Sequence, residues 1–135
     1  YGISRAVVCD ASDVIGVAPA TPVGVTRLLG WVADVRALNA GAAIHLTINR
    51  APRDAFRKAE LEQEIRRTFE PVSLVFLPHD PRVEAAAWSG TLVASGPYAK
   101  AVAELATKVV PPPLSPARAR RGSGKRRGRV PVVAR

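Results

Sequence analysis

Three residues that could contact a ligand follow directly after a short apolar segment. Residues 72–77 (Val-Ser-Leu-Val-Phe-Leu) are apolar apart from one serine and predict a strand buried on both faces, as in a parallel sheet. Pro78 lacks an N–H group and ends the strand, and Asp80 can cap a helix that begins at Pro81. Ligands of open α/β sheets bind at the carboxyl ends of the strands. Pro78, His79 and Asp80 are therefore candidates for contact with a ligand.

The rest of the folded region alternates apolar strands with amphipathic helices. Residues 1–10 are compatible with either a strand or a helix. The alternation predicts an α/β fold, a three-layer partial parallel sheet flanked by helices. The predicted strands are 13–17, 42–48 and 72–77, and the predicted helices begin after Thr21, Asp54, Asp80 and Gly96.

The positive charge of the chain is concentrated in its last segment. The net charge is +9, and residues 109–135 hold eight basic and no acidic residues, which leaves 12 basic and 11 acidic residues in 1–108. Because this segment is rich in Pro, Arg and Gly without apolar periodicity, we expect a disordered tail after an α/β domain of residues 1–108. Its candidate contacts with a nucleic acid or an anionic membrane are Arg118, Arg120, Arg121, Lys125, Arg126, Arg127 and Arg129.

Five short motifs follow one another at the ends of the predicted elements. They are Asp-Val-Ile-Gly-Val-Ala-Pro-Ala-Thr-Pro (13–22), Leu-Thr-Ile-Asn-Arg (46–50), Leu-Pro-His-Asp-Pro-Arg-Val-Glu-Ala-Ala (77–86), Trp-Ser-Gly-Thr-Leu-Val (88–93) and Gly-Pro-Tyr-Ala (96–99). In this order and spacing they resemble the C-terminal half of the MinD/ParA family of deviant Walker P-loop ATPases. The resemblance covers residues 5–108 and is greatest to CpaE-like and septum-site-determining members.

The resemblance implies an adenine pocket at the carboxyl ends of two strands. Carried over residue by residue, the family's pocket corresponds to Asn49, Pro78, His79 and Asp80. An Asn amide offers both a donor and an acceptor, which suits the edge of adenine. The alternatives are that Asn49 only ends a strand, that His79 is a solvated turn residue, and that Asp80 only caps a helix.

The chain departs from the family in the part that handles phosphate. No Gly-x-x-x-x-Gly-Lys-Ser/Thr motif occurs in the sequence, and this motif cradles the phosphates of the nucleotide. We therefore expect ATP to bind only when a missing N-terminal half completes the site, and the expected partner is that half or a second copy in a homodimer. This chain alone is expected neither to hold Mg²⁺ nor to hydrolyse ATP. Because it begins with Tyr1 and contains no Met, we expect a piece of a longer protein whose three-stranded sheet exposes an apolar edge.

Two functions of different classes remain open at this point. The resemblance implies that the chain is the base-side half of an ATPase, the half that contacts the adenine base and lacks the phosphate loop. Such an ATPase serves cell division, partitioning or pilus assembly. The alternative is a non-enzymatic α/β interaction module whose basic arm binds nucleic acid or an anionic membrane. A single cysteine and the lack of a long apolar segment favour a cytoplasmic location, with a peripheral position at the membrane or the nucleoid as a further option.

The remaining polar and aromatic residues suggest structural roles. His45 lies inside an apolar segment and is expected to be a core histidine with satisfied hydrogen bonds. No Ser–His–Asp set is evident in the sequence. Ser12, beside Asp10 and Asp13, is interpreted as a polar loop residue before a strand. We expect Trp88 to pack under the loop that follows it.

We predict weak binding of DNA through the basic tail. A flexible arm with eight cations releases counterions from DNA, so binding should be independent of sequence and should fade between low and physiological salt. The arm has no aromatic residue to stack on bases. Fluorescence anisotropy of a labelled duplex should therefore rise with the full chain and stay flat with a chain lacking residues 114–135. Equal binding by the truncated chain would place the contact on the folded domain, and no binding by either form would leave the tail a solubilising terminus.

Overall fold

The computed structural model describes residues 2–110, which form five helices and three strands. The tail residues predicted to contact nucleic acid or a membrane lie outside these described residues. None of the helices within residues 2–110 is long and apolar enough to cross a membrane. The elements are α1 (Gly2–Asp10), β1 (Asp13–Pro19), α2 (Pro22–Leu38), β2 (Ala43–Ala51), α3 (Ala55–Thr68), β3 (Ser73–Pro78), α4 (Arg82–Ser89) and α5 (Pro97–Val109).

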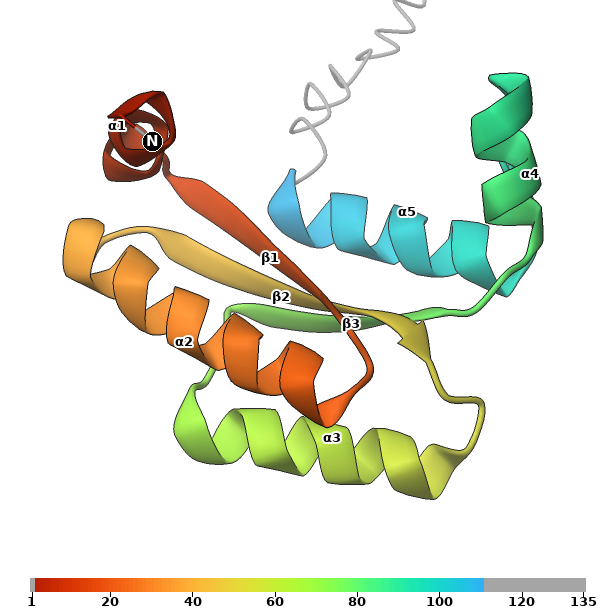
Figure 1. Ribbon diagram of the computed structural model, residues 1–135, viewed down its shortest axis with the longest axis horizontal. Helices are drawn as coiled ribbons and strands as arrows, with labels where there is room; N and C mark the ends of the chain where they lie inside the picture. Colours follow the sequence, from red (N-terminus) through yellow and green to blue (C-terminus); the bar gives the residue numbers. More distant parts are fainter. Residues whose placement is uncertain (1, 111–135) are drawn as a thin grey trace, which may run out of the picture.

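The three strands form a parallel sheet in the order β1-β2-β3, with helices on both of its faces. Helices α2 and α3 lie on one face, and α5 crosses the other face over β3 (Figure 1). The predicted α/β fold, a three-stranded parallel sheet flanked by helices, is confirmed. The segment before β1, which the sequence left open, is a helix.

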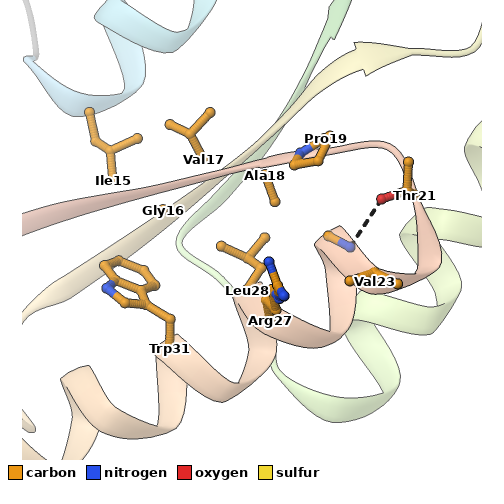
Figure 2. A pocket seen from close by; sticks show the side chains of 11 residues that line it. Ile15, Gly16, Val17, Ala18, Pro19, Thr21, Val23, Arg27, Leu28 and Trp31 are labelled. Carbon is orange, nitrogen blue, oxygen red and sulfur yellow. Dashed lines mark hydrogen bonds between the residues drawn. The ribbon is translucent and has the colours of Figure 1, made fainter.

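Local capping signals fix the starts of the first two helices that follow strands. The Thr21 hydroxyl accepts a hydrogen bond from the Gly24 N–H at 3.0 Å, and Pro22 is the first residue of α2 (Figure 2). The Asp54 carboxylate accepts from the Phe56 N–H at 3.0 Å in the same way. Each helix therefore begins where the sequence predicted it.

The hydrophobic core lies between the sheet and α2. Ile44, Leu46 and Ile48 of β2 are fully buried, and they alternate along the strand toward α2. Burial of side chains of this size contributes roughly 1.5–3 kcal/mol each relative to exposure. The core residues that α2 supplies recur with helical spacing, namely Val25, Leu28, Val32 and Val35.

A polar cluster of the buried His45 and Ser73 with the exposed Asp13 joins the amino ends of the three strands. His45 is 1% exposed, with its Nδ1 2.8 Å from the Ser73 hydroxyl and its Nε2 3.0 Å from an Asp13 carboxylate oxygen. The expected core histidine with satisfied hydrogen bonds is thus confirmed, but the expectation that no Ser–His–Asp set exists is wrong. Parallel pairing sets His45 opposite Ser73, which is itself buried, so the cluster joins the strands and does not present a nucleophile to solvent.

We predict that Asp13 contributes to the loss of stability in acid. The hydrogen bond from His45, with that from Ser12, lowers the pKa of the Asp13 carboxyl below its usual 3.8. A group with a depressed folded-state pKa stabilises the fold above its unfolded pKa, and this contribution disappears as the pH falls through the folded value. Urea unfolding between neutral pH and about pH 3 should therefore show a smaller acid-induced loss of stability in Asp13→Asn than in the wild type.

The exposed carboxyl Asp34 on α2 provides the matched control. The Asp34→Asn variant should retain the wild-type dependence of stability on pH. If Asp13→Asn follows that same dependence, the hydrogen bond from His45 does not stabilise the carboxylate form.

Candidate functional site

All four predicted pocket residues line one cavity at the carboxyl ends of β2 and β3. The cavity has a volume of about 350 Å³, which lies within the range of small-ligand sites. Asn49 comes from β2, and Pro78, His79 and Asp80 come from the end of β3 and the turn after it. The remaining lining residues are Arg50, Pro81, Val83, Glu84, Ala87 and Tyr98.

An irregularity in β2 presents Asn49 and Arg50 at this edge. The pairing of β2 with β3 shifts register between Ile48 and Ala51. Strand β2 ends at Ala51, three residues beyond the predicted end at 48. Arg50 has a φ of 54°, a left-handed conformation that is uncommon outside glycine. Such bulges and strained residues concentrate at functional sites.

The bulge also determines which groups of Asn49 remain for a ligand. The Arg50 N–H donates to the Asn49 Oδ1 at 2.8 Å and occupies one acceptor position of that oxygen. Within residues 2–110 the Asn49 Nδ2 group donates no hydrogen bond. Asn49 therefore keeps two donor hydrogens and one acceptor position.

Asp80 is committed to the start of α4. Its carboxylate accepts from the Arg82 N–H at 3.0 Å and pairs with the Arg82 guanidinium through Nε at 3.0 Å and Nη2 at 2.7 Å. These bonds hold the pKa of Asp80 below its usual value and raise that of Arg82. Asp80 thus accepts from the first N–H of α4, but the N-cap residue is Pro81, and the helix begins at Arg82 and not at Pro81 as predicted.

Arg82 also ties the start of α5 to this turn. Its Nη2 donates to the Ser95 carbonyl oxygen at 2.9 Å. The next residue, Gly96, has a φ of 97°, and a Cβ there would lie 2.6 Å from the Arg82 Nη2. The close passage of the chain by Arg82 places Tyr98, in the first turn of α5, at the cavity.

Sequence reasoning missed two features of this site. Tyr98 lies in the Gly-Pro-Tyr-Ala motif, but its contact with the cavity depends on the Arg82 bridge, which is not visible in the sequence. Arg53 lines an adjoining hollow of about 490 Å³ that shares Tyr98 with the first cavity. His79 lines the cavity and is exposed.

The prediction that Trp88 packs under the loop that follows it is wrong, because Trp88 is 87% exposed.

The lining offers groups for hydrogen bonding and for flat apolar contact. It offers an amide, a proline ring, a phenol ring, Arg50 and the Glu84 carboxylate at the ends of parallel strands, and Arg53 lines the adjoining hollow. The only carboxylate supplied by the β3–α4 turn, that of Asp80, is engaged by Arg82. A planar group fits the amide and the two ring surfaces, while Arg50 and Glu84 place opposite charges at the cavity.

No family model matches the chain, and no curated protein matches it.

We predict that Gly96 is essential to the geometry of the site. Its φ of 97° and ψ of −176° lie in a region that is almost exclusive to glycine, and a methyl group would meet Arg82. Gly96→Ala should cost about 2–3 kcal/mol in the free energy of unfolding. Urea unfolding of the two proteins measures this difference.

Gly90 offers a matched control with a positive φ but free space around it. Its φ is 65°, and a Cβ there would meet nothing within 4 Å. Gly90→Ala should therefore cost only about 1 kcal/mol, the price of the left-handed conformation. Equal losses in the two variants would show that contact with Arg82 does not constrain the α5 start.

Proposed function

We propose that this chain is the base-side half of a MinD/ParA-like ATPase, in a protein of cell division, partitioning or pilus assembly. The observation that supports this proposal is the convergence of Asn49, Pro78, His79 and Asp80 on one cavity. The resemblance named these residues from two segments almost 30 positions apart in the sequence. Their shared cavity is what an adenine pocket requires.

The side chains at the cavity suit the chemistry of adenine. The free Nδ2 of Asn49 can donate to a ring nitrogen, while its Oδ1 can accept from the exocyclic amine. Pro78 and Tyr98 provide flat apolar surfaces from opposite elements, β3 and α5. Adenine presents the complementary pattern of a planar ring with a donor beside an acceptor.

The phosphates have fewer partners than the base. Arg50 and Arg53 supply positive charge near the cavity, and arginine pairs well with phosphate oxygens. Without a phosphate loop in the sequence, most of the affinity for a nucleotide and all of the catalysis must come from another polypeptide segment or a partner chain. ATP and Mg²⁺ are therefore the cofactors of the completed ATPase.

We predict that this chain binds adenine nucleotides at no better than about millimolar affinity and releases no phosphate from ATP. Saturation-transfer NMR with AMP should show contact at the adenine protons, weaker contact with GMP, and loss of the AMP signal in Asn49→Ala. The reason is that Asn49 supplies both hydrogen bonds to the base edge. A phosphate-release assay with ATP should stay at the level of the blank without protein.

Gln63→Ala removes an exposed amide on α3 away from the cavity and controls for the loss of a surface amide. This variant should retain the AMP signal. Equal signals from AMP and GMP, or an AMP signal that survives Asn49→Ala, would contradict base recognition at this cavity. Phosphate release that Asn49→Ala abolishes would contradict the catalytic part of the proposal.

A further inference from the structure

One carboxylate at the cavity formed by the ends of β2 and β3 has no partner in the described part of the chain. Two acidic residues line this cavity, Asp80 and Glu84. Asp80 is engaged by the backbone N–H and the guanidinium of Arg82. Within residues 2–110, Glu84 accepts no hydrogen bond and forms no ion pair, although Arg50 lines the same cavity. The Glu84 carboxylate therefore keeps its acceptor positions for a ligand.

Glu84 lies in the first turn of α4, and helical spacing places it on the side of that helix that lines the cavity. Val83, Glu84 and Ala87 line the cavity together, at positions that share one face of a helix. An acid in the first turn of a helix also interacts favourably with the helix dipole. This effect explains an acid near the start of α4, but it does not explain why that acid lines a cavity that Asn49 reaches from β2.

The side-chain amide of Asn49 presents its donor and its acceptor in a fixed order. Its Oδ1 accepts from the Arg50 N–H at 2.8 Å, a bond that only the oxygen of the amide can accept. Turning the amide over would set its NH₂ group against the Arg50 N–H, donor against donor. A purine that pairs with both groups of Asn49 must therefore offer an acceptor to Nδ2 and a donor to Oδ1. Adenine does so through its ring nitrogen N7 and one hydrogen of its 6-amino group.

We propose that Glu84 accepts the second hydrogen of the 6-amino group and thereby selects for this group. The inference rests on the adenine cavity proposed above, and it adds a third hydrogen bond to the two that Asn49 supplies. A 6-amino group carries two hydrogens, and Asn49 accepts only the one on the N7 side. An ionised carboxylate only accepts hydrogen bonds, so Glu84 suits the hydrogen on the other side of the amine. With both hydrogens bonded, neither donor loses its partner when the base leaves water.

A carbonyl oxygen at the same place on the ring would meet acceptors on both sides. The 6-oxygen of hypoxanthine or guanine would face the Asn49 Oδ1 and the Glu84 carboxylate. A carboxylate can also pair with the N1–H and the 2-amino group of guanine, but that pairing still sets the 6-oxygen against the Asn49 Oδ1. The ligands that fit this pair of residues are therefore 6-aminopurines.

NMR titration of the full, isotopically labelled chain with AMP and with inosine 5′-monophosphate (IMP) tests the selection. The two nucleotides differ in the group at position 6 and in the proton on N1, so the wild-type dissociation constant for IMP should exceed that for AMP by about tenfold or more. Glu84→Gln can donate as well as accept, so the IMP-to-AMP ratio should fall by at least about threefold. Both ligands carry the same phosphate, so the loss of one negative charge cancels in this ratio.

AMP methylated once at its 6-amino group tests the assigned hydrogen. The methyl group prefers the N1 side of the ring, so it replaces the hydrogen assigned to Glu84 and leaves the hydrogen assigned to Asn49. Methylation should weaken binding to the wild type by about tenfold, and to Glu84→Ala by less than about twofold. Glu60→Ala removes an exposed carboxylate on α3, outside the cavity, and should show the wild-type loss.

The two proposals fail in different ways. An unchanged IMP-to-AMP ratio in Glu84→Gln, or equal losses on methylation in the wild type and Glu84→Ala, would overturn the role of Glu84. In that case, AMP binding that depends on Asn49 would still support the adenine cavity. No binding of AMP, or binding indifferent to Asn49→Ala, would overturn both. Circular dichroism of each variant verifies that it is folded.

Discussion

The parallel pairing of β1 and β3 with β2 is the constraint on which the rest of the molecule depends. β2 is the central strand, and its residues from Ile44 to Ile48 are almost completely removed from solvent. Parallel pairing places all three amino ends at one side of the sheet and all three carboxyl ends at the other. The polar cluster of Asp13, His45 and Ser73 therefore forms at the first side, and the cavity at Asn49 and Pro78 forms at the second.

The two ends of the sheet differ in how far their polar groups are satisfied. At the amino ends, His45 uses both ring nitrogens within the protein, which allows a polar side chain to sit in the core at little cost. At the carboxyl ends, the bulge at Arg50 interrupts the ladder, and Asn49 keeps donor capacity that the fold does not use. Unused donor capacity beside a hollow is the property expected of a binding site, and it distinguishes the cavity from the cluster at the amino ends, where His45 has both ring nitrogens bonded.

Sequence patterns predicted what depends on neighbouring residues and failed where distant residues meet. Thr21 and Asp54 cap helices through residues two or three positions away, so their roles could be read from the chain. The Ser73–His45 contact spans 28 positions and follows from strand register, which apolar runs do not reveal. Asn39, whose side chain donates to three carbonyls at the end of α1, was missed for the same reason.

In the candidate site, too, some residues could be predicted from the sequence and others depend on contacts between distant parts of the chain. Pro78, His79 and Asp80 were named because they follow a predicted strand, and the family resemblance added Asn49; parallel strands bring such residues together. Tyr98 depends on the bridge from Arg82 to Ser95 and on the backbone of Gly96, so it could be found only once the chain was folded. Arg82, the first residue of α4, thus bonds both to Asp80 in the preceding turn and to the Ser95 carbonyl before α5. Because of these bonds, Arg82 fixes how closely the start of α5 approaches the β3–α4 turn, a contact between elements that local sequence patterns do not reveal.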